Sequence, residues 1–240
     1  MLRLPVVSVM AAAIVAFAPL PSFSQPGTGR LKAIVGDEGG KPVRQAVVVY
    51  SRIPVGQRDP RGRFHEAPGQ VPISSQASVD AAGAFITPQV PAGNYTLCIK
   101  AAGYLTSCNW SGWLTTAISS GQDHDFGRIV LKKAVAVTIR INDPLHLLPR
   151  DPNSLGISAG VIDDDHVYHG PDSTDADSNG RTLQVGVPLG RAMQLWLHSI
   201  RFRLATGDGA IVNSTGTKIP FRANEGGLPP TFVVNVSGAK

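Results

Sequence analysis

Three short stretches of the chain carry residue types that could do chemistry, and the first is "GISAG", Gly156 to Gly160. It fits the pattern G-x-S-x-G, in which a serine on a sharp turn between a strand and a helix acts as a nucleophile. Here "VIDDD" follows, which is not a helical pattern, and the chain lacks the alternating helices of a hydrolase fold. We therefore expect Ser158 to lie on a strand, and a hydrolase that uses it is the weakest of our functional hypotheses.

The second stretch is "DADSNG", which matches the first half of a calcium-binding loop. Oxygen ligands at alternating positions suit a hard cation, but the glutamate expected at the twelfth position is replaced by Gly186. Asp, Asn and Gly are also common in tight turns, where their side chains bond the local backbone. We favour a turn, and a calcium ion held by Asp175, Asp177 and Asn179 is the alternative.

The third stretch, "DDDHVYHG", places His166 and His169 beside the carboxylates of residues 163–165. Two histidines three residues apart on a strand would face opposite sides, so joint binding of a metal would require a loop. A solvated acidic loop is the interpretation we favour. The sequence contains no H-x-x-E pair, so the helix-borne zinc site of many peptidases is not expected. We expect neither catalysis nor a required cofactor.

Aromatic residues gather around Cys108 in "GYLTSCNWSGW". Exposed rings of Tyr104, Trp110 and Trp113 could stack on sugar rings, because a flat apolar face complements the C–H surface of a carbohydrate. Alternatively, the rings cap the hydrophobic core beside a disulfide.

The two cysteines of the chain, Cys98 and Cys108, are ten residues apart. In an oxidising compartment we expect a disulfide between them. In the chain-entropy model, closing so short a loop adds about 2.5–3 kcal/mol to stability. Two thiolates without a nearby histidine would leave zinc short of ligands, so a metal site is a poor alternative.

The first 24 residues have the layout of a secretory signal peptide. Arg3 precedes an apolar run from Val6 to Ala18, and Ser22 and Ser24 supply small residues before a cut. This run is shorter than the ~20 residues that a spanning helix needs, and no later run is long enough. We therefore expect an exported protein without a transmembrane segment, located in the periplasm or outside the cell.

Composition narrows the class of partner and of fold. The chain has 240 residues, of which 26 are Gly and 19 Pro, and 22 basic residues face 17 acidic ones for a net charge of +5. Without a run of five or six like charges, a nucleic-acid partner is not expected. Abundant Gly and Pro with few charges favour many short strands joined by tight turns.

The strand pattern and turn residues indicate an all-β chain of about 13–15 strands. Alternation predicts strands at 31–35, 46–53 and 126–132, and a strand whose residues Tyr95, Leu97 and Ile99 share one face. We interpret residues 54–76, which are polar and rich in Pro and Gly, as a long surface loop. "DAAG" before Phe85 predicts a hairpin turn, with Gly83 at the position of positive φ.

One pattern of turn residues occurs twice. From the first aspartate, a Gly, a Pro and a second Gly follow at distances of 3, 11 and 13 residues in each copy. The residues are Asp80, Gly83, Pro91 and Gly93, then Asp177, Gly180, Pro188 and Gly190. A period near 97 residues suggests two tandem copies of one β unit, with a boundary near Lys133. In a chain so rich in Gly and Pro, chance matching is the alternative.

The first copy resembles the carboxypeptidase regulatory-like domain family over about residues 29–132. The resemblance is carried by "LKAIVGDEGGKPVRQAVVVY", "VDAAGAFITPQVPAGNYTLCIKAAGY" and "FGRIVL", and residues 134–240 are only weakly similar. It implies a transthyretin-like Greek-key β-sandwich, also similar to carbohydrate-binding modules, and no catalytic residues. The domains expected are a signal peptide at 1–24 and sandwiches at 29–133 and 134–240.

The functional hypothesis is an exported, non-catalytic binding or structural module. Its partner would be a polysaccharide or, in the alternative, a protein of the cell envelope contacted through loop 54–76.

Overall fold

The computed structural model of the chain describes residues 27–59, 61, 63–66, 73–151, 156–213, 215–224 and 227–240. The predicted signal peptide lies outside the described residues. Within them, regular structure consists of 20 strands and a single four-residue helix, α1 (Ser107–Trp110). The all-β prediction is confirmed, although the expected number of strands was too low because strands of two or three residues show no readable alternation. None of the helices described is long and apolar enough to cross a membrane.

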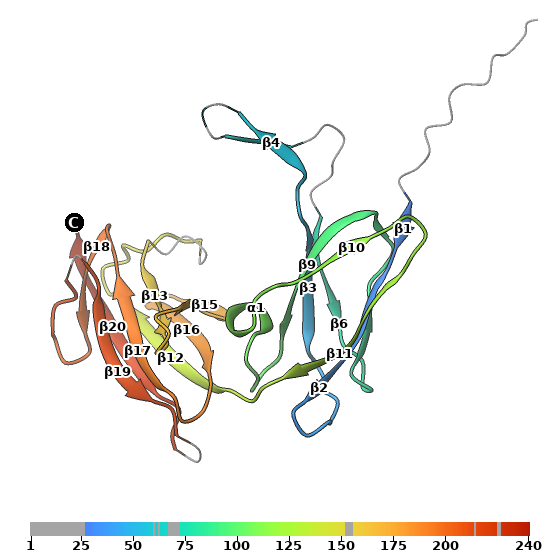
Figure 1. Cartoon of the computed structure of the whole chain (residues 1–240). Coiled ribbons are helices and arrows are strands. Elements are labelled where there is room, and N and C mark those ends of the chain that lie inside the picture. The colour runs from blue at the N-terminus through green and yellow to red at the C-terminus, as the bar shows by residue number, and fades with distance from the viewer. Residues whose placement is uncertain are drawn as a thin grey trace, which may run out of the picture.

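The strands between Thr28 and Leu131, here called the N-half, form a sandwich of two sheets (Figure 1). One sheet has the order β10-β9-β3-β6 and the other β11-β2-β7. Their bounds are β2 (Leu31–Asp37), β3 (Val47–Arg52), β6 (Ser74–Ser78), β7 (Ala84–Ile86), β9 (Gly93–Lys100), β10 (Leu114–Ile118) and β11 (His124–Leu131). Two short strands, β1 (Thr28–Gly29) and β8 (Val90–Pro91), pair with each other.

The strands between Val135 and Ala239, here called the C-half, form a second sandwich. Its sheets have the orders β14-β13-β17-β19 and β15-β16-β12-β20-β18. The bounds are β12 (Val135–Asn142), β13 (Ser158–Ile162), β14 (Tyr168–His169), β15 (Ser173–Asp177), β16 (Gly180–Val187), β17 (Ala192–His198), β18 (Phe202–Thr206), β19 (Thr217–Arg222) and β20 (Thr231–Ala239).

The two halves share the topology of seven strands. In each half the last strand pairs in parallel with the first (β11 with β2, β20 with β12), and every other shared pair is antiparallel. The order β11-β2-β7 corresponds to β20-β12-β16, and β10-β9-β3-β6 corresponds to β19-β17-β13-β14. The C-half adds β15 at one edge of its larger sheet and β18 at the other. The fold is therefore a tandem pair of β-sandwiches.

Each half has its own hydrophobic core, made from residues that alternate along the strands. Tyr95, Leu97 and Ile99 have no exposed area, as the alternation predicted. The hydroxyl of Tyr95 donates to the carbonyl of Pro91 at 2.8 Å, which satisfies the polar end of this buried ring and ties it to the preceding turn. Burial raises the pKa of Tyr95, and the nearby charge of Arg52 partly opposes that shift.

The "DAAG" turn is not a hairpin turn. Gly83 has a φ of 83°, as predicted, but the turn connects β6 of one sheet to β7 of the other. The corresponding turn in the C-half does close a hairpin, because β15 and β16 are paired and Asp177 lies opposite Gly180 next to the turn. Similar residues can serve both turns because a local Asp–Gly reversal does not specify which sheet the next strand joins.

The expected loop at 54–76 has regular structure in its described part. β4 (Gly56–Arg58) and β5 (Phe64–Glu66) pair as a ribbon that projects from the N-half (Figure 1). β6 begins at Ser74, inside the stretch expected to be a loop. These strands lack the apolar alternation of core strands, so the sequence pattern did not reveal them. Residues 60, 62 and 67–72 of this stretch lie outside the described residues.

Candidate functional site

Helix α1 lies between the two sandwiches and connects them (Figure 1). The predicted disulfide between Cys98 and Cys108 is present and fixes α1 to β9, with the two Cα atoms 5.0 Å apart. The hydroxyl of Ser107 accepts the main-chain N–H of Ile99 at 2.8 Å, which adds a buried hydrogen bond to the same attachment. A helix of four residues could not hold its position through its own hydrogen bonds, so these two links to β9 position it.

Trp110, the last residue of α1, packs on the core of the C-half, although it belongs to the N-half in sequence. Its ring stacks on the ring of His169 with a centroid distance of 3.6 Å and an interplanar angle of 8°. Its indole N–H donates to the carbonyl of Gly186 at 2.9 Å. Trp110 therefore contributes both apolar contact and a directed hydrogen bond to the contacts between α1 and the C-half, here called the junction.

His169 is buried and is held on both sides of its ring. Nε2 lies 2.9 Å from Oδ2 of Asp163, and Nδ1 lies 2.7 Å from the carbonyl of Asn109. Both neighbours are hydrogen-bond acceptors, so either tautomer of the ring donates to one of them, and the ring is fixed between the two.

Asp163 is also buried, with 7% of its surface exposed. Burial alone would raise the pKa of its carboxyl. The hydrogen bond from His169, the main-chain N–H of Val167 and the charges of His169 and Arg191 outweigh burial and lower the pKa below its ordinary value. The carboxylate is thus held in its charged form, as a buried partner for His169.

A second set of hydrogen bonds joins the halves through Asp172. Its Oδ1 accepts the side-chain amide of Asn109 at 2.9 Å, and its Oδ2 accepts the main-chain N–H of Gly186 at 2.7 Å. The ammonium of Lys100 lies 3.5 Å from its main-chain carbonyl. One carboxylate oxygen of Asp172 therefore connects α1 to the C-half, and the other is bonded within the C-half.

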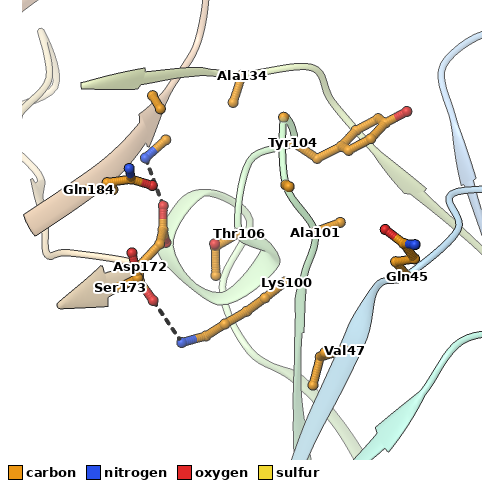
Figure 2. A pocket seen from close by; sticks show the side chains of 14 residues that line it. Gln45, Val47, Lys100, Ala101, Tyr104, Thr106, Ala134, Asp172, Ser173 and Gln184 are labelled. Carbon is orange, nitrogen blue, oxygen red and sulfur yellow. Dashed lines mark hydrogen bonds between the residues drawn. The ribbon is translucent and has the colours of Figure 1, made fainter. Parts of the chain in front are cut away.

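A groove of about 320 Å³ lies beside these contacts, between the two halves. Figure 2 shows Gln45, Lys100 and Tyr104 on the N-half side, with Asp172 and Gln184 opposite. The groove offers polar groups and one cation, but its one carboxylate is already bonded through both oxygens. Because most of its lining is apolar, the groove suits packing contacts rather than proton transfer.

The three aromatic residues singled out by sequence separate into different environments. Trp110 is part of the junction described above, and Tyr104 packs against the N-half core at the rim of the groove. Trp113 has 51% of its surface exposed. The three rings therefore do not form a common stacking platform.

The candidate calcium ligands lie on a hairpin, with Asp175 and Asp177 on β15 and Asn179 in the turn. Both oxygens of Asp177 bind the guanidinium of Arg140, at 2.6 and 3.0 Å. The Arg140 hydrogen bond and the N–H of Asn179 lower the pKa of Asp177 to about 2. The hydrogen bonds of Asp177 with Arg140 and Asn179 explain the presence of Asp177 in this turn without an ion. Calcium binding stays a prediction.

Ser158 lies within β13 and faces solvent, opposite His198 of β17 in the strand register. It is followed by strand rather than helix, so the stretch is not a nucleophile elbow. His166 lies on a turn with a φ of 65° and is exposed, whereas His169 is buried. These two histidines therefore do not form the joint metal site weighed above.

Carboxylate oxygens of Asp163, Asp164 and Asp165 do lie within 4.8 Å of one another. They are already paired, since Asp163 bonds His169 and the other two bond Arg191. The solvated-loop interpretation is correct for residues 164 and 165, which are exposed, and wrong for residue 163.

Sequence reasoning missed the junction because its parts are separated by about sixty residues, as Asn109 and His169 illustrate. The one available signal was the weak alternation of "VYHG", which places Tyr168 and His169 on opposite faces of a short strand.

No protein-family model and no curated protein matches the chain. Among solved structures, similarity extends to the Bacillus anthracis TIE protein at 13% identity, covering 88% of this chain and 34% of that chain with a TM-score of 0.32. A Streptococcal ancillary pilin has 17% identity, with 87% of this chain and 62% of that chain covered and a TM-score of 0.38. A putative carbohydrate binding protein from Pseudomonas aeruginosa has 16% identity, 45% and 90% coverage, and a TM-score of 0.25.

This chain thus spans a third to three-fifths of the length of the first two of these structures. At TM-scores of this size, the similarities carry no argument about family or function. The fold described above rests on the strands and cores of this chain itself.

Proposed function

We propose that this chain is a non-catalytic, exported interaction protein, in which two sandwiches act as one rigid body. The observation that carries the proposal is the contact across the two halves between half-buried Trp110 and the buried pair of His169 and Asp163. Titratable groups that could serve catalysis are used there to fix the halves together. An enzyme would need such groups to remain available to a substrate.

The proposal includes the domain organisation expected from the sequence. Sandwiches at 29–133 and 134–240 follow a signal peptide at 1–24, and the first belongs to the carboxypeptidase regulatory-like family. The separate hydrophobic cores of the two halves support this division. The partner is a protein of the cell envelope, contacted by exposed parts of the N-half such as the β4–β5 ribbon.

Position-specific photocrosslinking in intact cells tests this function. A crosslinker at Arg61, which is exposed on the ribbon, should give one defined adduct with an envelope protein, and a crosslinker at exposed Lys218 of the C-half should not. Equal adducts at both positions, or a hydrolytic activity that Ser158→Ala abolishes, would contradict the proposal.

A polysaccharide is the second candidate partner, favoured by the half-exposed ring of Trp113. Retention on insoluble polysaccharides should then be lost in Trp113→Ala. Unchanged retention in this variant would exclude stacking on Trp113, and lack of retention on any polysaccharide would exclude this candidate.

A further inference from the structure

The free edge of β11 differs from the corresponding edge of the C-half. β18 pairs antiparallel with β20 there, from Phe202 opposite Ala239 to Thr206 opposite Val234. In the N-half, β11 is the last strand of its sheet. A strand that the duplicated fold accommodates at this edge is therefore present in one copy and missing from the other.

The N-half retains only the beginning of that strand. Tyr104 forms an antiparallel bridge with Lys133, and the N–H of Leu105 donates to the carbonyl of Lys132 at 2.8 Å. Continued by two residues, this pairing would bring residue 107 opposite Val130. Instead, α1 begins at Ser107 and the chain leaves the sheet.

The main-chain N–H and C=O groups of Arg128 and Val130 on β11 face the edge of the sheet that does not pair with β2. Val35 donates its N–H to Gly83 in the direction of β7, so the even-numbered residues of β2 face β11. In the parallel register Arg128 lies beside Ile34 and Val130 beside Gly36. This pattern directs the N–H and C=O groups of Arg128 and Val130 away from β2 and toward the edge.

The opposite edge of this sheet is capped at Ala84. The main-chain N–H of Ala84 donates to the Asp80 carboxylate at 2.8 Å, and the carbonyl of Ala84 accepts the N–H of Asp80 at the same distance. Local bonding of this kind blocks pairing with another strand. β11 has no such cap over Arg128 and Val130 in the described residues.

A groove of about 330 Å³ runs along the open part of β11. Apolar side chains line it, among them Leu105, Leu114 and Ile129. In the C-half, β18 buries Phe202 and Leu204, which are 5% and 2% exposed. The groove therefore lies where an added strand would place its inward side chains.

The charged residues that line the groove are cationic. Lys132 and Arg191 line it, and none of its described lining residues is Asp or Glu. Arg191 is paired with Asp164 and Asp165, whereas no described carboxylate is paired with Lys132. An incoming strand would thus meet an apolar inner surface and, at the rim, the ammonium group of Lys132.

We propose that β11 accepts an extended segment of another protein, in which apolar side chains alternate with acidic ones. The segment would pair antiparallel with Arg128 and Val130, as β18 pairs with β20. Main-chain hydrogen bonds would supply affinity, and the alternating side chains would supply specificity. This inference rests on the proposed interaction function and identifies the chemistry of the partner segment.

Titration of the full chain with a fluorescent peptide of alternating valine and glutamate, about eight residues long, tests this assignment. Saturable binding should shift the amide resonances of residues 128–131. N-methylation of every second residue of the peptide, in the phase that faces β11, should weaken binding at least tenfold, because it removes the main-chain donors. N-methylation in the other phase is the matched control.

Charge reversal at the exposed Lys132 gives a second readout. Lys132→Glu should weaken the glutamate peptide about tenfold and favour a valine–lysine peptide, whereas Lys41→Glu, at an exposed turn of the same half, should change neither. Absence of saturable binding, or affinity insensitive to N-methylation in both phases, would overturn the assignment. So would self-association of the chain through residues 128–131 in the absence of peptide. None of these results would affect the rigid docking of the two halves, which is tested separately below.

Discussion

The connection that follows the long central strand is used differently in the two halves. In the C-half, residues after β17 return as β18, extend the sheet and bury Phe202 and Leu204. In the N-half, the residues after β9 pair only briefly, around Tyr104 and Leu105, and then form α1. This helix carries Trp110 into the other sandwich. One copy therefore uses this segment for its own core and the other for docking.

This difference shows how a duplicated fold can acquire an internal interface without a change in its topology. The seven shared strands keep their order and pairing in both halves. The disulfide of Cys98 and Cys108 lies in the N-half, where it holds α1 against β9 and away from the edge of β11. β11 has an open edge because the segment leaves the sheet at Ser107.

The largest effect on stability is expected from breaking the hydrogen bond between Asp163 and His169, on which Trp110 of α1 packs. Asp163→Ala leaves Nε2 of the buried His169 without its hydrogen-bond partner. Breaking a buried pair by removing one member costs about 3–5 kcal/mol. Chemical denaturation should show this loss of unfolding free energy. Asp175→Ala, at an exposed position of β15, is the control and should change stability by less than about 0.5 kcal/mol. Equal stability of the two variants would show that the pair contributes nothing.

Truncation in β18 tests the other use of the segment. Leu204→Ala removes a side chain that is 2% exposed, and such substitutions cost about 2–5 kcal/mol. The loss should appear in tryptophan fluorescence of the C-half and in faster amide hydrogen exchange of β20. If exchange in β2 and β11 accelerates equally, the two cores are not independent.

Removing the disulfide should have a somewhat smaller effect. Cys98→Ala combined with Cys108→Ala should lower the free energy of unfolding by about 2.5–3 kcal/mol, by the loss of loop closure in the unfolded chain. The stacking of Trp110 on His169 should weaken as well, because α1 keeps only the Ser107 bond to β9. Near-ultraviolet circular dichroism would report it, and an unchanged tryptophan signal would mean that Trp110 docks without the disulfide.

The smallest effect is expected at the β15–β16 hairpin of the C-half, where Asp177 pairs with Arg140. The pKa of Asp177 is lowered from 3.8 to about 2 by Arg140, so the pair stabilises the folded state above pH 4. That contribution should be lost as the pH falls from 4 toward 2. Asp177→Asn should reduce the slope of unfolding free energy against pH in this window, and an unchanged slope would indicate that the pair is fully screened.

The repeated spacing of turn residues was readable in the sequence because it has a steric cause. A Cβ at Gly83 would lie 2.5 Å from the carbonyl oxygen of Val35, and one at Gly180 would lie 1.9 Å from that of Ile141. In both halves the glycine thus sits against the central strand, which no larger residue permits. Strand alternation likewise predicted the buried face at Tyr95, Leu97 and Ile99.

Other features depend on contacts that no local pattern encodes. After the second turn, the buried positions begin three residues beyond Gly190, whereas they begin two residues beyond Gly93, so the copies differ in phase. The contact of Trp110 with His169 joins residues 59 positions apart, and nothing near either residue specifies its partner. Tertiary packing decided both.

Residual dipolar couplings of backbone amides measure directly whether the two sandwiches form one rigid body. We predict that one alignment tensor fits the couplings of both halves, and that Trp110→Ala requires two tensors of different magnitude while each half keeps its own fold. If the unaltered chain already requires two tensors, or if Trp110→Ala still fits one, the docking role of α1 is contradicted.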